Sequence, residues 1–238
     1  MLEVDTHVHT VVSGHAHSTI YENVTFAKRV GLKGFASTDH GPHVHNTPKD
    51  FTLKIMKSWP DTMEGIRVYK SIEANIMDAC GRLDVGNQHM PTFEFVLAGI
   101  HELDDMTADE RLSGCVAAYE NPYLDCVTHP DKQKYIVEFE PVVLAAKKHN
   151  KLVELNNKSL HIRAGGRESV PKLVALCKKH NVRMIISSDA HICYNVGNFA
   201  LAEQLLKEME FPEELVLNKY QKVFDTYVSE RAKRLDLV

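Results

Sequence analysis

The sequence lacks the long apolar runs of a membrane protein. No stretch approaches the roughly 18 consecutive apolar residues of a membrane-spanning helix. The chain also begins with a strand-like segment rather than with the basic region and short apolar run of a secretory signal. We therefore expect a soluble, cytoplasmic protein that does not act on or in membranes.

An excess of positive charge is also missing. The formal net charge is -4, which leaves no basic face for a phosphate backbone. We therefore expect no nucleic-acid partner.

Paired cysteines are absent as well. The five cysteines are odd in number, widely spread and contain no C-x-x-C pair. This pattern excludes a disulfide framework and a thiolate zinc site, and it predicts reduced, mostly buried side chains.

Histidine is the residue present in excess, with 14 copies against a single Trp and no tract or tag. The chain has 238 residues, 44% of them hydrophobic, and this is enough for one sizeable core. We expect a single domain that spans residues 1–238.

Seven short apolar runs alternate with longer amphipathic stretches, a pattern typical of parallel strands joined by crossover helices. The runs are Leu2–Thr6, Gly34–Thr38, Arg67–Ile72, Phe95–Ile100, Leu124–Thr128, Leu152–Asn156 and Met184–Ser188. No Gly- or Pro-rich linker interrupts them, which favours a closed or nearly closed α/β barrel over an open sheet.

Three helices are predicted between these strands. Ser18–Val30 begins with serine as its N-cap, and Pro141–His149 and Pro171–His180 each begin at proline. The last two end in the same Lys-Lys-His-Asn sequence. His149 and His180 are therefore interpreted as helix-end residues, each followed by a left-handed Asn cap.

Potential metal ligands lie at the ends of six of the seven predicted strands. They are His7 with His9, His40, Glu73, His101, His129, and Asp189 with His191. Residues i and i+2 of a strand point the same way, so the first and last pairs are potential chelates. One histidine at a strand end is usually just a polar terminus, but the joint pattern predicts a buried metal cluster.

Two further histidine pairs lie in loops. His15 and His17 follow the first strand, and one of them is expected to reach the metals. His43 and His45 lie in a Pro-containing loop and are left out of the ligand set, as substrate contacts or exposed residues.

These motifs together resemble the PHP (polymerase and histidinol phosphatase) superfamily. D-T-H-V-H-T, T-D-H-G, E-A-N, G-x-H, T-H-P and S-D-A-H occur in that family's order. The resemblance covers residues 1 to about 220 and is closest to short, single-domain YcdX-type bacterial phosphatases.

The resemblance implies a distorted (β/α)7 TIM-like barrel with a trinuclear site. His7, His9, Glu73 and Asp189 would hold one metal, and Glu73 would bridge to a second that is also bound by His101 and His129. His15, His40 and His191 would hold the third. Zinc is the first choice for such imidazole-rich ligation, with manganese or iron as alternatives.

Three divalent ions would outweigh the two carboxylates, so the site is expected to take an anionic ligand. We predict hydrolysis of a small phosphomonoester by a metal-activated hydroxide. Asp5 is expected to orient His7 or a neighbouring ligand, and Asp39 has the same interpretation on weaker grounds.

A loop, NNKSLHIRAGGRES, is expected after the sixth strand, and it gathers Lys158, Arg163 and Arg167. Arginine matches phosphate geometry, so Arg163 is the preferred phosphate contact. No unassigned carboxyl group is evident at a strand end, which leaves water, His17, His43 and His161 as alternative proton donors to the leaving group.

Other functions fit part of the pattern. H-x-H on a first barrel strand also occurs in metal-dependent amidohydrolases, and PHP domains also accompany DNA polymerases. Histidinol-phosphate phosphatase and phosphodiesterase activities remain alternatives within the superfamily. The C-terminal segment 219–238 is expected to form a helix that either closes the barrel bottom or meets a second subunit in a homo-oligomer.

Overall fold

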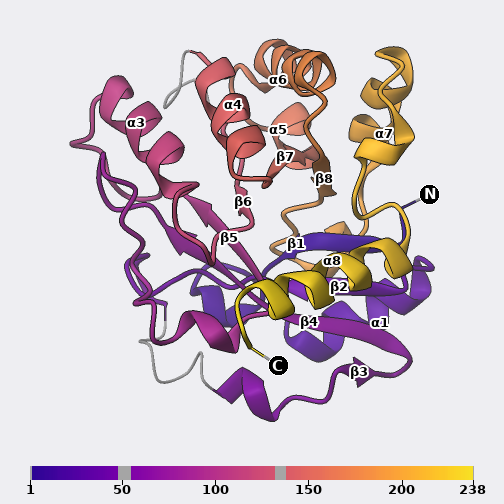
Figure 1. Ribbon diagram of the computed structural model, residues 1–238. Coiled ribbons are helices and arrows are strands. Elements are labelled where there is room, and N and C mark those ends of the chain that lie inside the picture. Colours follow the sequence, from indigo (N-terminus) through magenta and orange to yellow (C-terminus); the bar gives the residue numbers. More distant parts are fainter. Residues whose placement is uncertain (1, 48–54, 132–137, 238) are drawn as a thin grey trace.

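The computed structural model describes residues 2–47, 55–131 and 138–237, and it forms an α/β barrel that is nearly closed (Figure 1). Seven parallel strands follow one another in the order β1-β2-β4-β5-β6-β7-β8. They are β1 (Val4–Val8), β2 (Gly34–Ser37), β4 (Ile66–Asn75), β5 (Phe95–Gly99), β6 (Cys126–Val127), β7 (Leu152–Asn156) and β8 (Met184–Ser187). Each predicted apolar run overlaps one of these strands, so the expected fold class is confirmed.

The strand boundaries differ from the prediction at the site. β1 ends at Val8, so His7 lies inside the strand and not after it. β4 continues to Asn75, which also places Glu73 inside its strand. In both cases a polar residue is buried at a position where the apolar pattern predicted the strand to end. A short strand that was not predicted, β3 (Thr62–Met63), pairs antiparallel with β4.

At the barrel seam, β1 and β8 do not form a regular strand pair within the described residues. An isolated parallel bridge joins Val8 to Ala190, beyond the end of β8. Lower in the barrel, the Nδ2 of Asn218 donates to the carbonyl oxygens of Val4 and Ile186, both at 2.7 Å. Its Oδ1 accepts the amide of Ile186 at 2.9 Å. The side chain of Asn218 therefore takes the place of a missing rung of the sheet.

Helices surround the strands. In the described residues they are α1 (Ile20–Arg29), α3 (Ala108–Ala118), α4 (Glu140–Lys148), α5 (Asn157–His161), α6 (Gly166–His180), α7 (Ala200–Glu208) and α8 (Gln221–Arg234). Short 3-10 turns add η1 (Val11–Ser13), η2 (Ile55–Ser58), η3 (Met90–Thr92), η4 (Cys193–Asn195) and η5 (Glu213–Leu215). No helix of the described residues is long and apolar enough to span a membrane.

Two predicted helix starts are wrong. The N-cap of α1 is Thr19, which forms a capping box with Glu22, while the hydroxyl of Ser18 accepts the amide of Cys193. α6 begins at Gly166, so Pro171 lies inside the helix rather than at its first position. The sequence pattern marked Pro171 as a start because proline is common at the first helical position.

The segment expected as a loop after the sixth strand is largely helical, because α5 follows β7 without a break. α6 then packs closely on α5 at Gly166. A Cβ atom at this position would lie 2.0 Å from the carbonyl oxygen of Ser159. Gly166 is therefore required for this packing, which fixes α5 and its cationic side chains next to β8.

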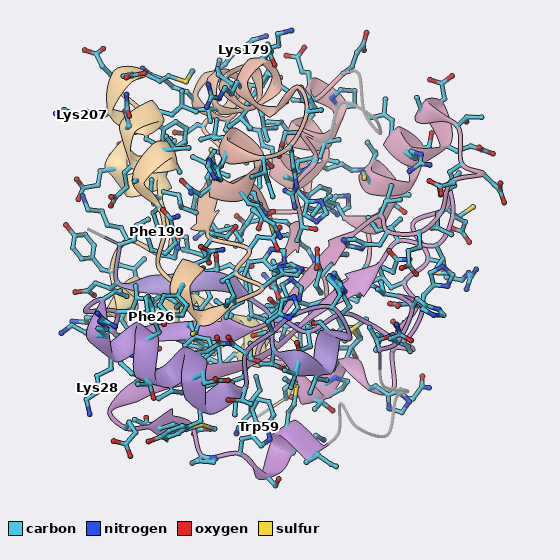
Figure 2. All side chains as sticks on the ribbon, turned by 180° about the vertical axis from the view of Figure 1, so that it is seen from behind. Phe26, Lys28, Trp59, Lys179, Phe199 and Lys207 are labelled. Atoms are coloured by element: carbon cyan, nitrogen blue, oxygen red, sulfur yellow. The ribbon has the colours of Figure 1, made fainter. Side chains whose placement is uncertain are left out.

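The predicted helix ends at the repeated Lys-Lys-His-Asn sequence are confirmed. His149 caps α4 and His180 is the last residue of α6. Asn150 and Asn181 follow with φ of 52° and 54°, in the left-handed region. His180 also contacts Glu140 at 2.7 Å. The neighbouring Lys179, which lies at the outer edge of the molecule in Figure 2, contacts Glu140 at 2.8 Å.

α8 covers the bottom of the barrel (Figure 1). This confirms the first of the two alternatives predicted for the C-terminal segment. Its buried Phe224 and Tyr227 pack on inward-facing strand residues, among them Tyr69 and Phe95. Buried Arg231 pairs with Asp125 at 2.7 Å. With the bottom filled, the C-terminal ends of the strands are the end of the barrel at which the polar site lies.

All five cysteines are free thiols, as expected. Cys115, Cys126 and Cys177 are buried, Cys193 is partly buried and Cys80 is exposed.

Candidate metal centre

The nine predicted ligands lie together at the C-terminal ends of the strands. They come from β1 (His7, His9), the turn after η1 (His15), the ends of β2, β5 and β6 (His40, His101, His129), β4 (Glu73) and the end of β8 (Asp189, His191). Strands that are far apart in sequence thus bring their polar ends to one place. The sequence pattern predicted this convergence.

Glu73 lies at the centre of the cluster. Its Oε2 is 3.2 Å from His7 Nε2, 3.5 Å from His9 Nε2 and 3.0 Å from His40 Nδ1. Its Oε1 is 3.4 Å from His101 Nε2 and 3.0 Å from His129 Nε2. One carboxylate therefore faces five imidazoles, the arrangement expected of a bridging ligand.

Asp189 faces the other side of the cluster. Its Oδ1 is 3.5 Å from His9 Nε2 and 3.3 Å from His191 Nδ1. The Nε2 of His191 lies 2.9 Å from the Nε2 of His15, which is itself exposed. The cluster thus opens to solvent near His15.

Three groups of donor atoms are compact enough for a metal ion, each with all its atoms within 4.8 Å of one another. They are His7 with His9 and Asp189; His9 with His40 and His191; and His40 with Glu73 and His101. The first group contains three of the four residues, all but Glu73, that the family resemblance implies for one metal ion. His40 belongs to two groups, so the grouping by distance does not by itself divide the ligands among ions.

The hydrogen bonds of His7 and His9 require a cation between them. The Nδ1 of His7 donates to the Glu154 carboxylate at 2.7 Å. The Nδ1 of His9 donates to Ser13 Oγ at 2.9 Å, because that hydroxyl gives its own proton to Asp39. Both Nε2 atoms, 2.9 Å apart, are left with lone pairs that face each other. Either a proton or a metal ion must lie between them.

Asn75 fixes His101 in the same way. Its Oδ1 accepts from the backbone amide of His101 at 2.8 Å and from Nδ1 at 3.1 Å, and its Nδ2 donates to the His101 carbonyl. The Nε2 lone pair of His101 therefore points at Glu73. Two electron-rich atoms in contact again fit a bound cation, so the residues present suit a metal centre.

Burial and charge set the pKa values of the cluster. Burial opposes a charge on His7, but Glu73, Glu154 and Asp189 together raise its pKa well above the usual range. Burial and the neighbouring His40 lower the pKa of His9. Against the effect of burial, the imidazoles hold the pKa values of Glu73 and Asp189 well below the usual range. The two carboxylates are therefore ionised and available as ligands.

Glu154 is the functional residue that the sequence analysis missed. It lies in β7, fully buried, and it provides the carboxylate contact to the His7 ring that was expected from Asp5. The available signal was a glutamate inside a run predicted to be a buried parallel strand. Glu154 lies in the middle of its strand, whereas the predicted ligands were residues at strand ends.

Asp5 instead ties β1 to the segment after β8. Its carboxylate accepts the amides of His7, Ser188 and Gly197 and the hydroxyl of Ser188. It thus holds the backbone on either side of the site without touching the His7 ring. Asp39 acts on His9 through the hydroxyl of Ser13.

Two cations lie beside Asp189. Arg163 pairs with its Oδ2 and donates to Ser159 Oγ at 2.8 Å. The Nζ of Lys158 is 3.5 Å from Oδ1 of Asp189 and 3.0 Å from His191 Nδ1. Arg167, the third cation of this segment, is exposed and donates to the Leu160 carbonyl.

The proposed proton donors His17, His43 and His161 are all exposed. A carboxyl group near a strand end was overlooked: Asp131 follows β6 by a few residues and is buried. Burial raises its pKa, although Ser159 and Arg163 lower it.

Two of the predicted ligands have unusual backbone conformations. The φ angles are 32° at His129 and 52° at Asp189, in the region that L residues rarely adopt. Such strain persists where surrounding contacts enforce it and is frequent at functional sites.

Comparisons with known proteins agree with this geometry. A family model described as "PHP domain" matches residues 5–229. The chain is 37% identical to a "Probable phosphatase" of Acetivibrio thermocellus over 98% of this chain and 97% of the relative. It is 35% identical to one of Caldicellulosiruptor bescii over 99% of both chains.

A solved structure shares the fold at 17% sequence identity with a TM-score of 0.62, covering 88% of this chain and 94% of the other. It is a histidinol phosphate phosphatase of Lactococcus lactis in complex with zinc, L-histidinol and phosphate.

Proposed function

The chain belongs to the PHP domain family, and on this premise we propose that it is a metal-dependent phosphatase that hydrolyses small phosphomonoesters. The observation that carries the proposal is the convergence of histidine lone pairs on Glu73 and Asp189. A cluster of this kind needs several cations, and several cations attract a phosphate group. Relatives of nearly equal length bear the description "Probable phosphatase".

We assign the nine clustered residues as ligands of three divalent ions. His7, His9, Glu73 and Asp189 would hold one, Glu73 with His101 and His129 a second, and His15, His40 and His191 the third. Zinc is the preferred ion because the donors are mainly imidazoles, with manganese and iron as alternatives. Bound there, divalent ions lower the pKa of water and neutralise charge that develops on the phosphoryl group.

The remaining residues bind and orient. Arg163 and Lys158 lie at the edge of the cluster, where their positive charges would attract and hold the phosphate group of the substrate. Arg163 also fixes Oδ2 of Asp189 so that Oδ1 faces the imidazoles. Asp5 keeps β1 and the segment after β8 together, and so supports the ligands that both carry.

Metal analysis coupled to a substrate panel tests this function. The panel contains phosphomonoesters including histidinol phosphate, phosphodiesters and amides. We expect three ions per chain and hydrolysis of monoesters. Metal content well below two ions per chain would refute the cluster, and a metal-loaded protein that acts on amides alone would refute the phosphatase.

A further inference from the structure

β7 differs from the other six barrel strands because it supplies none of the proposed ligands. It contributes instead the buried side chains of Glu154 and Asn156, which lie on the same face of the strand. Both contact the ligand cluster: Glu154 reaches His7, and Asn156 donates to Oδ2 of Asp189 at 3.2 Å.

Each oxygen of Glu154 accepts two hydrogen bonds. Oε1 accepts from His7 Nδ1 at 2.7 Å and from Ser187 Oγ at 2.6 Å. Oε2 accepts the backbone amide of His129 at 2.6 Å and the Nδ2 of Asn156 at 3.3 Å. Four donors from four different residues hold this carboxyl group in one position.

These contacts join ligands of two different metal positions. His7 belongs to the position that includes Asp189, and His129 to the position that includes His101. The amide that Glu154 holds is that of a residue with φ of 32°. A shift of the carboxylate would therefore turn the His7 ring and release His129 from its strained conformation.

We propose that Glu154 is a positioning residue that couples the occupancy of these two metal positions. The inference rests on the ligand assignment of the proposed function. An ion at the first position fixes the His7 ring and with it the carboxylate of Glu154. The carboxylate then holds His129 where the second ion needs it.

Asn75 offers a matched control. It is also buried and also fixes a ligand, with three hydrogen bonds to His101. His101 belongs to the second position alone. Asn75→Ala should therefore weaken one position, whereas Glu154→Gln should weaken two.

Zinc binding to the full-length, chelator-stripped chain separates these outcomes. Zinc is titrated against a competing indicator, and native mass spectrometry counts the bound ions. At a concentration that just saturates the wild type with three ions, we expect two in Asn75→Ala and one in Glu154→Gln. Loss of a hydrogen-bond partner behind a metal ligand commonly weakens metal binding about 10–100-fold. The metal position formed by His15, His40 and His191 should keep its wild-type zinc affinity in both variants, and it serves as the internal reference.

The coupling is refuted if Glu154→Gln binds all ions with wild-type affinity, or if it loses one ion alone. Circular dichroism of the metal-free variants establishes that they fold. If Glu154→Gln does not fold, Ser187→Ala provides the test, because it removes one donor and leaves the carboxylate in place. We expect it to weaken the same two positions about fivefold, the effect of roughly 1 kcal/mol, and weakening of fewer than two positions would overturn the coupling.

A different result would refute the proposed function without refuting the coupling of the two metal positions. A wild-type chain that binds zinc but hydrolyses no phosphate ester would refute the phosphatase and leave the coupling measurable.

Discussion

Arg163 and Asp189 form an ion pair through Oδ2, the carboxylate oxygen turned away from the imidazoles, while Oδ1 lies 3.5 Å from His9 Nε2. The Arg163 side chain is 14% exposed, so part of it is accessible to a substrate that enters the site. Arg163 is therefore placed both to orient Asp189 as a metal ligand and to bind the phosphate group of a substrate.

Arg163→Met should raise the KM for a phosphomonoester and the inhibition constant of inorganic phosphate by about tenfold or more. A hydrogen bond between charged groups contributes about 1.5–3 kcal/mol. Steady-state kinetics and metal analysis provide the measurement, with exposed Arg167→Met as the matched control. If Arg163→Met loses metal but keeps the wild-type inhibition constant of phosphate, Arg163 orients Asp189 and does not bind phosphate.

Asp189→Ala should remove at least one bound ion and reduce kcat/KM about a thousandfold or more. Metal ions contribute several kcal/mol to charge stabilisation in the transition state. Elemental analysis and ester hydrolysis are the readouts. His180→Ala is the control, because His180 pairs with Glu140 at a helix end, and both readouts should stay at wild-type values. Retained activity in Asp189→Ala would contradict the ligand assignment.

Removal of metal should lower thermal stability. The lone pairs of His7 and His9 face each other at 2.9 Å, and a bound ion relieves this contact in the folded state alone. An ion present at 100 times its dissociation constant stabilises by about 2.7 kcal/mol. For a chain of this size that corresponds to a rise in Tm of roughly 5–10 °C. Differential scanning fluorimetry with chelator and then with zinc measures it, and an unchanged Tm would argue against a metal centre.

Asp5 should make stability depend on pH. Burial raises the pKa of Asp5 from 3.8 to about 6, although the hydrogen bonds from Ser188, Gly197 and His7 lower it in part. Between these values the folded chain keeps a proton that the unfolded chain has lost. The contribution of Asp5 is therefore full below 3.8 and is lost as the pH rises through about 6.

We therefore expect the stability of the wild type, relative to Asp5→Asn, to fall by about 2 kcal/mol as the pH rises from 4 to above 6. Urea unfolding of both metal-free proteins at several pH values gives the difference, in which all other titrating groups cancel. A difference that does not change with pH would show that the pKa of Asp5 is not raised.

Asn218→Ala should destabilise the barrel seam. The substitution removes the Asn218 partner of the buried Val4 carbonyl and of the Ile186 amide, and it removes one of two donors to the Ile186 carbonyl, which still accepts from the Thr6 hydroxyl. We expect a loss of about 2–5 kcal/mol in the free energy of unfolding, from several unpaired buried groups. Denaturant unfolding measures it, and Asn87→Ala at an exposed position should change little. A loss below 1 kcal/mol would mean that the seam closes without Asn218.

Sequence periodicity predicted the barrel and the place of the cluster because parallel strands end at one face. It was less accurate for boundaries. His7 and Glu73 are polar residues that lie inside strands and are buried because the other residues of the site surround them. A prediction from apolar runs ends the strand before such residues. The start of α6 was missed because Pro171, a residue common at helix starts, lies within the helix.

Contacts between distant residues could not be read from the sequence. Glu154 has no motif of its own, and its role depends on His7 lying 147 positions away. Asp5 was expected to orient His7 or a neighbouring ligand, as carboxylates often do behind metal-bound imidazoles, yet its side chain accepts from Ser188 and from backbone amides. The sequence indicated which residue types would meet, and the side-chain hydrogen bonds of the folded chain decide which residue orients which ligand.

The absence of a proposed ligand on β7 has a consequence for how this protein could diversify. The segment that follows this strand carries Lys158 and Arg163 on and just after a short helix, where they border the cluster without belonging to the ligand set. Substitutions there could alter which esters are accepted while the metal-binding residues stay unchanged. Evolution or engineering of substrate range would therefore be expected to begin in α5.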